Sequence, residues 1–140
     1  IAFDVFATVT VRDSSFVGAF TLILHNAQTV RDSEIVFRNV TFNTTSAGAF
    51  VLLGNGGSVR NTTIRFEDCT FLVTRSAGDA RALQLDSAAF AASSLRVIRT
   101  TLTTTTRAAI AAAIQMRNGA TISGASTVAL VNSTVSSTSA

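Results

Sequence analysis

The stretch "IVFRNVTF", residues 35–42, reads as a β-strand with a polar interruption at its centre. Its first hydrophobic pair, Ile35 and Phe37, lies on one side of an extended chain, and its second pair lies on the other, because side chains alternate along a strand. A straight strand therefore cannot bury both pairs. A corner at Arg38-Asn39 would reverse the alternation, so we expect the chain to bend there, with both pairs facing one core.

Nearly the same phrase occurs five times, and we call it the main phrase. The copies are "VTVRDSSF" at 9–16, "IVFRNVTF" at 35–42, "IRFEDCTF" at 64–71, "LRVIRTTL" at 95–102 and "VALVNSTV" at 128–135. The corner position holds Asp13, Asn39, Asp68, Arg99 and Asn132. Asn and Asp tolerate left-handed backbone and bond to their own turn. The alignment therefore predicts one column of corner residues.

Two shorter phrases precede each later copy. The second phrase is "TLIL" at 21–24, "VLL" at 51–53, "LQL" at 83–85 and "IQM" at 114–116, and the third is "TVRD" at 29–32, "SVRN" at 58–61, "AFAA" at 89–92 and "TIS" at 121–123. Their nearly constant spacing predicts three short strands per repeat. A repeat of 26–33 residues is too short for a four-stranded propeller blade.

We therefore predict an all-β fold, a right-handed single-stranded parallel β-helix (solenoid) of about five coils with three short strands per coil. Residues 1–140 should form one β-helix segment, which we expect to be a fragment of a longer solenoid. An exposed coil offers unpaired strand edges and an open core. Expressed alone, the segment is expected to associate end to end or to aggregate.

The inward columns predict a filled core. Phe16, Phe42 and Phe71 should stack as one ladder, and Phe37 and Phe66 as a second. Cys69 shares its column with small residues, which predicts a buried structural thiol.

Residues 107–119, "RAAIAAAIQMRNG", allow two interpretations. Helix propensity favours a helix that ends at Asn118-Gly119. The repeat instead favours a strand at 113–117, with Ile114 and Met116 in the columns of Leu22 and Leu24. The sequence leaves open whether 107–113 is helix or loop.

Composition excludes several classes of protein. Hydrophobic residues make up 47% of the chain and charged residues 14%, which is too apolar for a disordered chain. All eleven cations are Arg, spread along the sequence, so we expect no nucleic-acid partner. The apolar run at 108–114 is too short to span a membrane. The single cysteine, Cys69, excludes an internal disulfide and a Cys-rich zinc site.

No catalytic, cofactor-binding or metal-binding residue is predicted. Enzymes that resemble pectate lyases or polygalacturonases need clustered carboxylates, and the acidic residues here show no such pairing. His25, the only histidine, is interpreted as a turn residue, and "GNGG" at 54–57 as a tight turn rather than a phosphate loop. The threonines of 100–106 could suggest an ice-binding face, but we expect no matching column in other coils.

Four Asn-x-Ser/Thr sequons are candidates for N-glycosylation: Asn43, Asn61, Asn39 and Asn132. Asn43 opens a variable segment and should be the most accessible. Asn39 and Asn132 already have a role as corner residues.

The phrase shared by "IVFRNVTF" and "IRFEDCTF" resembles the coils of the kinetoplastid dispersed gene family, surface glycoproteins built from right-handed parallel β-helix repeats. The resemblance implies an extracellular or cell-surface location and a structural or adhesive role, without catalytic residues. The expected partners are adjoining coils, end-to-end copies, glycans or other surface proteins. The alternative is part of a carbohydrate-active β-helix enzyme, a polysaccharide lyase or hydrolase. Clustered carboxylates on one outward face would favour the enzyme, whereas a face covered by Thr, Ser and Arg would favour the scaffold.

Overall fold

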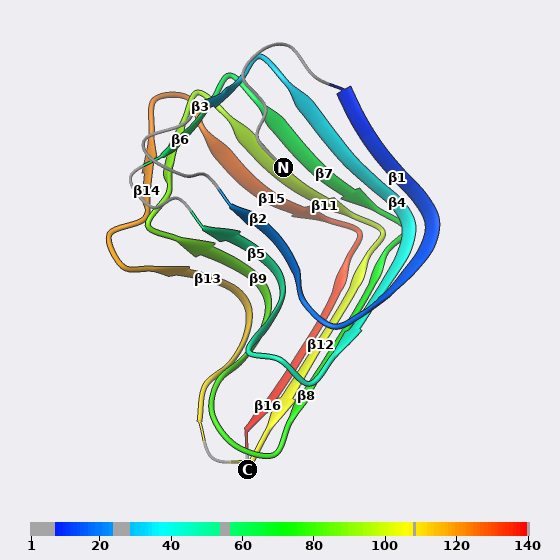
Figure 1. The fold of residues 1–140 in the computed structure, drawn as a ribbon. Helices are drawn as coiled ribbons and strands as arrows, with labels where there is room; N and C mark the ends of the chain where they lie inside the picture. Colours follow the sequence, from blue (N-terminus) through cyan, green and yellow to red (C-terminus); the bar gives the residue numbers. More distant parts are fainter. Residues whose placement is uncertain (1–7, 24–28, 54–56, 108, 140) are drawn as a thin grey trace.

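A computed structural model describes residues 8–23, 29–53, 57–107 and 109–139. All regular structure in these ranges is β-strand, and the chain winds into a solenoid with three faces (Figure 1). We call each successive turn a level. Level one is β1 (Thr8–Val17), and level two is β2 (Phe20–Ile23), β3 (Thr29–Arg31) and β4 (Glu34–Thr44). Level three is β5 (Gly48–Leu53), β6 (Ser58–Arg60), β7 (Thr63–Glu67) and β8 (Thr70–Arg75).

The last two described levels repeat this order. Level four is β9 (Ala80–Asp86), β10 (Ala89–Ala91), β11 (Ser94–Ile98) and β12 (Thr101–Thr106). Level five is β13 (Ala111–Arg117), β14 (Thr121–Ser123), β15 (Thr127–Val131) and β16 (Thr134–Ser139).

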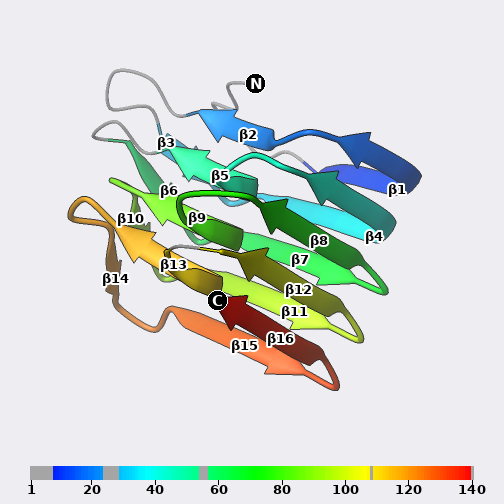
Figure 2. The same ribbon diagram turned by 90° about the horizontal axis from the view of Figure 1, so that it is seen from below.

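Every strand pairs in parallel with the equivalent strand of the next level (Figure 2). Sheet A holds the main phrase, from β1 and β4 through β7/β8 and β11/β12 to β15/β16. Sheet B is β2, β5, β9 and β13, and sheet C is β3, β6, β10 and β14. The predicted parallel β-helix is thus confirmed, with a right-handed winding in Figures 1 and 2. Only sheet A has five levels, so the described chain makes fewer full turns than the five predicted coils.

The corner within sheet A is confirmed at every level. Asp13, Asn39, Asp68, Arg99 and Asn132 all adopt left-handed backbone, with φ between 47° and 52°. We call this column the A corner. β1 and β4 run continuously through it, whereas in levels three to five it divides the main phrase into two strands. The three predicted strands per coil therefore become four in those levels.

Sequence reasoning missed two further columns of left-handed residues. Between sheets C and A, the C corner contains Asp32 (φ 51°), Asn61 (φ 46°) and Ala92 (φ 46°). Between sheets B and C, Ser87 and Asn118 have φ of 55° and 51°. The third phrases "TVRD" and "SVRN" end in Asp and Asn, and this was the available signal. Asn61 is therefore a corner residue, as Asn39 and Asn132 are.

Of the residues named at the C corner, Ala92 is the least suited to left-handed backbone. Replacing it with glycine is therefore expected to stabilise the fold, whereas most substitutions destabilise it. Left-handed backbone costs a residue with a Cβ about 1–2 kcal/mol, a penalty that glycine lacks. We expect Ala92→Gly to raise the free energy of unfolding by about 0.5–1 kcal/mol, measured by chemical denaturation. Ala91→Gly, one residue earlier in β10, is the matched control and should lower it. A loss of stability in Ala92→Gly would contradict the corner geometry.

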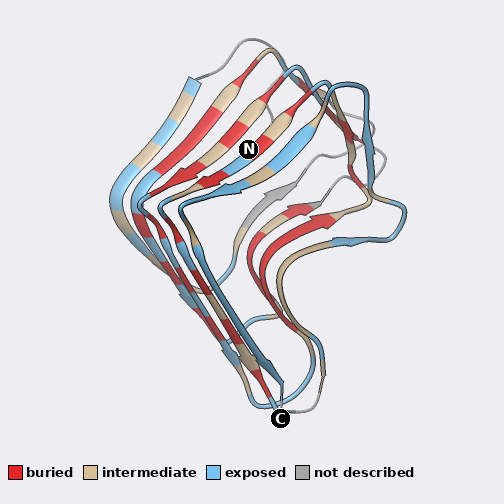
Figure 3. Cartoon of the chain, turned by 180° about the vertical axis from the view of Figure 1, so that it is seen from behind, coloured by how far each residue is buried: buried red, intermediate tan, exposed pale blue. Residues whose placement is uncertain are grey.

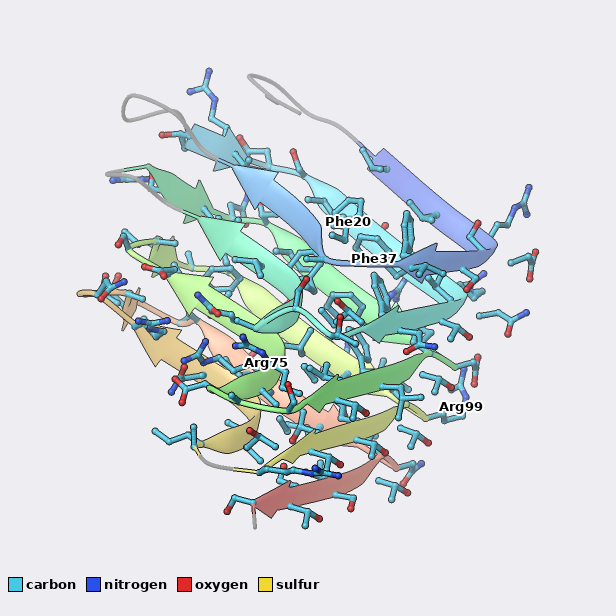
Figure 4. All side chains as sticks on the ribbon, turned by 60° about the horizontal axis from the view of Figure 1, so that its bottom comes forward. Phe20, Phe37, Arg75 and Arg99 are labelled. Atoms are coloured by element: carbon cyan, nitrogen blue, oxygen red, sulfur yellow. The ribbon has the colours of Figure 1, made fainter. Side chains whose placement is uncertain are left out.

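The core is built on stacked phenylalanines. Phe42 lies 4.5 Å from Phe71 and 5.3 Å from Phe16 between ring centroids, and Phe37 lies 4.9 Å from Phe66. Both predicted ladders are confirmed. A third, Phe20 on Phe50 at 5.7 Å, was not predicted. Figure 4 shows Phe20 beside Phe37, with their rings 5.3 Å apart and edge to face, so the ladders also interlock across the core.

Small polar side chains support the backbone where it turns. Thr100 follows the A corner; its hydroxyl accepts a hydrogen bond from the Cys69 amide (3.2 Å) and donates one to the Ile98 carbonyl (2.9 Å). The Ser133 hydroxyl accepts from the Thr100 amide in the same way. At the C corner, the Ser93 hydroxyl accepts from the Thr62 amide. Backbone amides next to the corners have no carbonyl partner in the sheets, and these hydroxyls accept their hydrogen bonds instead.

The structure also decides between the two interpretations of residues 107–119. The described part is strand β13 from Ala111, so the helix alternative is wrong and the predicted strand is longer than expected. Ile114 and Met116 pair with Leu83 and Leu85.

The predicted columns of the second phrase were out of register. Phe50 pairs with Phe20 and with Leu83, so Ile114 continues the column of Phe20. Met116 likewise continues the column of Leu22 rather than that of Leu24. The error arose because two adjacent leucines, at 52 and 53, both fit the short phrase, and the pairing places Leu52 in the column of Leu22 and Leu85.

Candidate functional site

The carboxylates that could carry chemistry are joined to cationic or amide side chains. At the corners, Asn39 donates to Asp13 (2.9 Å) and Asn61 donates to Asp32 (2.6 Å). Each pair joins two successive levels. In the A corner, Asn39 thus lies between Asp13 and Asp68, so that these two carboxylates do not stack directly on each other.

A second group of charges lies on the outward side of sheet A. Arg38 binds Glu67 at 2.7 Å. Arg65 reaches Glu34 at 3.0 Å and Glu67 at 3.1 Å. The two arginines alternate with the two glutamates across levels two and three. This network links neighbouring levels, and each of the two glutamates contacts at least one arginine.

Arg99 and Asp68 form a two-pronged pair across the A corner, at 2.7 and 2.8 Å (Figure 4 labels Arg99). The hydrogen bond from Arg99 lowers the pKa of Asp68. It also raises the pKa of Arg99. Both shifts favour the ionised pair, which suits a bidentate arginine–carboxylate contact.

The outward side of sheet B carries a more buried cluster around β9. The Arg81 side chain is only 3% exposed and pairs with Asp79 and with Gln84. Burial lowers the pKa of Arg81, and the charge of Asp79 opposes that effect. Arg75, labelled in Figure 4, donates to the Asp79 carbonyl at 3.0 Å. The cluster fastens the loop before β9 to the strand.

Asp86 ends β9 and receives three hydrogen bonds. The donors are Asn118 (2.7 Å), Ser87 (3.0 Å) and Gln84 (3.0 Å). Burial works to raise the pKa of Asp86, but these bonds outweigh it and hold the pKa below the ordinary value. Asp86 is therefore an ionised acceptor and not a proton donor.

The lowered pKa values of Asp86 and Asp68 predict acid sensitivity. A carboxylate with a lower pKa in the folded state contributes stability that is full above the unfolded pKa, near 3.8, and lost as pH falls through the folded value. We expect the denaturation midpoint to be flat between pH 7 and 5 and to fall below about pH 4. Asp86→Asn should be less stable at pH 7 and should show a shallower fall. An unchanged acid slope in Asp86→Asn would contradict this role.

A hydroxyl-bearing surface covers the outward side of sheet A beyond the A corner, and we call it the hydroxyl face. One column has a hydroxyl at all five levels: Ser15, Thr41, Thr70, Thr101 and Thr134. A second column contains Thr74, Thr105 and Thr138. The expectation that the threonines of 100–106 have no matching column was wrong. The first column was visible in the main-phrase alignment, one position before the conserved hydrophobic residue.

The hydroxyl face is neutral. Between its two columns lie Val17, Asn43, Leu72, Thr103 and Ser136, none of them charged. Thr is β-branched and restricted at χ1, so its hydroxyl and methyl groups are held with little loss of freedom on binding. A flat neutral face of this kind suits contact with a broad surface better than chemistry on one bond.

The candidate residues named from the sequence do not form one site. His25 and residues 54–56 of the "GNGG" turn lie outside the described residues. Cys69 is buried as expected; its thiol donates to the Phe37 and Glu67 carbonyls, and burial raises its pKa, so it stays protonated. Within the described ranges, no group of three or more His, Cys, Asp or Glu is placed to hold a metal ion.

The four sequons occupy two kinds of environment. Asn39, Asn61 and Asn132 are corner residues, whereas Asn43 is exposed near the end of β4. An open depression of about 350 Å³ lies beside Asn43, lined by Val17, Gly18, Asn43, Thr44, Thr45 and Ser46. Its lining has no charged group, so it offers space around Asn43 but no anchor for a charged ligand.

No helix in the described part of the chain is long and apolar enough to cross a membrane. No protein-family model, curated protein or solved structure matches the chain.

Proposed function

We propose that this chain is a non-enzymatic structural or adhesion segment of an extracellular or cell-surface protein. The observation that carries the proposal is the use of the carboxylates. Each acidic side chain in the described part of the chain is held by an Arg or Asn partner, and most of these pairs bridge two levels. Charge is therefore used to hold the coil together.

The hydroxyl face is the proposed contact surface. It spans all five levels and carries no charge. The levels beneath it are linked by ion pairs and by stacked phenylalanine rings. Surface glycans and other surface proteins are the proposed partners, because hydroxyls both donate and accept hydrogen bonds. The main phrase also resembles coils of the kinetoplastid dispersed gene family, and we propose membership of a similar class of surface β-helix proteins.

The alternative, part of a polysaccharide lyase or hydrolase, has less support. Such a reaction needs an acid or base whose pKa lies near the working pH. The pKa values of Asp68 and Asp86 are instead lowered below the ordinary value of an aspartate, away from neutral pH. Assays for cleavage of acidic polysaccharides should therefore show no turnover.

Adhesion tests the proposal directly. The fluorescently labelled chain should bind to immobilised glycans or cell surfaces, and the double substitution Thr70→Lys with Thr101→Lys should abolish binding. Thr121→Lys, an exposed threonine in β14 of sheet C, is the matched control and should bind as the parent does. Polysaccharide cleavage by the parent, or equal binding by both variants, would contradict the proposal.

Glycosylation provides a second check. If the protein is secreted, Asn43 should be the most fully occupied acceptor, because it is exposed beside open space. Asn39 and Asn61 should be less occupied, since each side-chain amide already donates to an aspartate. Mass spectrometry of peptides from the native protein measures this, and an occupied Asn39 with a bare Asn43 would contradict it.

A further inference from the structure

The hydroxyl face is most regular on strands β8, β12 and β16, in levels three to five. The central row, on β12, turns three threonines outward at alternate positions: Thr101, Thr103 and Thr105. Pairing places the row of β16 directly beside them: Thr134, Ser136 and Thr138. The row of β8 lies on the other side: Thr70, Leu72 and Thr74. We call these three rows of three residues the hydroxyl grid, in which every residue except Leu72 carries a hydroxyl group.

The grid is straight and regular in two directions. In Figure 1, β8, β12 and β16 run straight beyond the A corner and nearly superpose. Figure 3 shows the middle levels of this region banded in red and paler colours, because side chains alternate between the core and the outside. Paired strands lie about 4.7–4.9 Å apart, and outward residues of one strand repeat about every 6.6–6.8 Å. Its hydroxyls therefore have a constant repeat along the strands and across them.

The hydroxyls of the grid are free to bind water or a ligand. In β12 they alternate with Thr104 and Thr106, which point inward and are bonded, Thr104 to Ser137 (2.9 Å) and Thr106 to the Gly78 carbonyl (2.6 Å). No grid hydroxyl makes a hydrogen bond to another group among the residues that the structure describes. Threonine is restricted at χ1, so its hydroxyl and methyl groups lose little freedom when they contact a surface.

Charge and shape restrict what the grid can recognise. It has no charged side chain, whereas nucleic acids, anionic lipids and other polyanions are held through Lys or Arg. Small ligands occupy concave sites, and the depression described above is lined by residues 17–18 and 43–46, outside the grid. A neutral, straight and periodic face is complementary to a neutral surface that is itself periodic.

The surface of ice has these properties. Its oxygen atoms repeat in two directions on the same scale as the grid, and a water molecule both donates and accepts hydrogen bonds, as a hydroxyl does. Water next to the threonine methyl groups is restricted in its orientations, while the hydroxyls between those methyl groups hold it by hydrogen bonds. The grid can therefore order a layer of water that continues into a crystal.

We propose that the hydroxyl grid binds ice. The threonines of one coil would not suffice, because the repeat across the strands exists only through the register of β8, β12 and β16. Ice binding goes beyond the adhesive role proposed above. It uses the same surface but does not depend on binding to glycans.

Partition into ice tests the proposal, since slowly growing ice excludes dissolved proteins that do not bind to it. The fluorescently labelled parent chain, in dilute solution, should enter the ice and should lower the freezing point of a seeded solution below its melting point. Thr103→Lys places a charge at the centre of the grid. It should lower the amount in the ice about tenfold or more, because a charge held against a neutral surface loses its hydration.

Thr121→Lys makes the same charge change in β14 of sheet C and is the matched control, which should enter ice as the parent does. Circular dichroism and chemical denaturation should show that both variants fold as the parent does, since both positions lie on the outside of the coil. Leu72→Thr tests the periodicity, because it supplies the missing hydroxyl of the grid. It should raise the amount of protein in the ice.

A parent that ice excludes, a Thr103→Lys variant that enters ice undiminished, equal losses in the two lysine variants, or a Leu72→Thr variant without gain would each overturn the proposal. Glycan binding is measured above the freezing point, so the two functions fail separately. A parent that binds glycans but is excluded from ice would overturn ice binding and leave the adhesive role standing. Entry into ice without glycan binding would do the reverse.

Discussion

Phe42→Ala is expected to lower the free energy of unfolding by about 3–5 kcal/mol, the range for removal of a buried phenylalanine from a packed core. Phe42 is fully buried. Its ring stacks between Phe16 and Phe71 and meets Phe37 and Phe66 edge to face. The loss would therefore remove contacts along the ladder and across it, and the rigid neighbours cannot collapse into the space.

Phe16→Ala is the matched control, because Phe16 belongs to the same ladder but is only half-buried. It should cost less than half as much as Phe42→Ala in the same denaturant titration. A solenoid level contacts mainly its neighbours, so two spectroscopic probes should be compared to establish that unfolding is two-state. Equal losses in the two variants would mean that the ladder is not the core of the fold.

The ladder that contains Phe42 could be predicted because the spacing of the main phrase is kept even where its residue types change. Phe42 and Phe71 stand at the same place in two nearly identical phrases, and a corner residue precedes each by three positions. Alternation of side chains then requires both rings to point inward. Residue types and spacing together determine this part of the fold.

The second phrase was less predictable for a physical reason. Its strands are short runs such as "VLL" at 51–53, in which a one-residue shift still leaves a hydrophobic residue inside. The bend of sheet B, with both Ala82 and Leu83 buried, also breaks the simple alternation. Register there is set by three-dimensional packing on sheet A, which a single sequence does not display.

The outer surface carries a hydroxyl column that was present in the alignment of the main phrase but was overlooked there. The hydroxyl column of Thr41, Thr70 and Thr101 follows from the same register as the Phe ladder. The cluster of Arg81, Asp79 and Asp86 could not be foreseen, because it depends on how the loop before β9 folds back. Columns are therefore readable from the sequence, whereas contacts made by loops of variable length are not.

The second large effect is expected at Thr100, whose hydroxyl joins two levels at the A corner. Thr100→Val keeps the shape of the side chain but leaves the Cys69 amide without its 3.2 Å partner, in a place where Thr100 is 1% exposed. An unpaired buried donor costs about 1–3 kcal/mol, and we expect a loss of unfolding free energy in that range. Thr100→Ser retains the hydroxyl and should lose less than Thr100→Val.

Thr103→Val in the same strand is the control, since Thr103 points outward and its hydroxyl makes no hydrogen bond within the described residues; its effect should stay within about 0.5 kcal/mol. Hydrogen exchange adds a readout specific to the corner: the Cys69 amide should exchange faster in Thr100→Val and keep its protection in Thr103→Val. If Thr100→Val were as harmless as Thr103→Val, the corner would not depend on its hydroxyl. The recurrence of Ser or Thr after the left-handed residue would then reflect size alone. Loss of stability together with loss of protection would instead show that the Thr100 hydroxyl supports the buried backbone next to the left-handed corner.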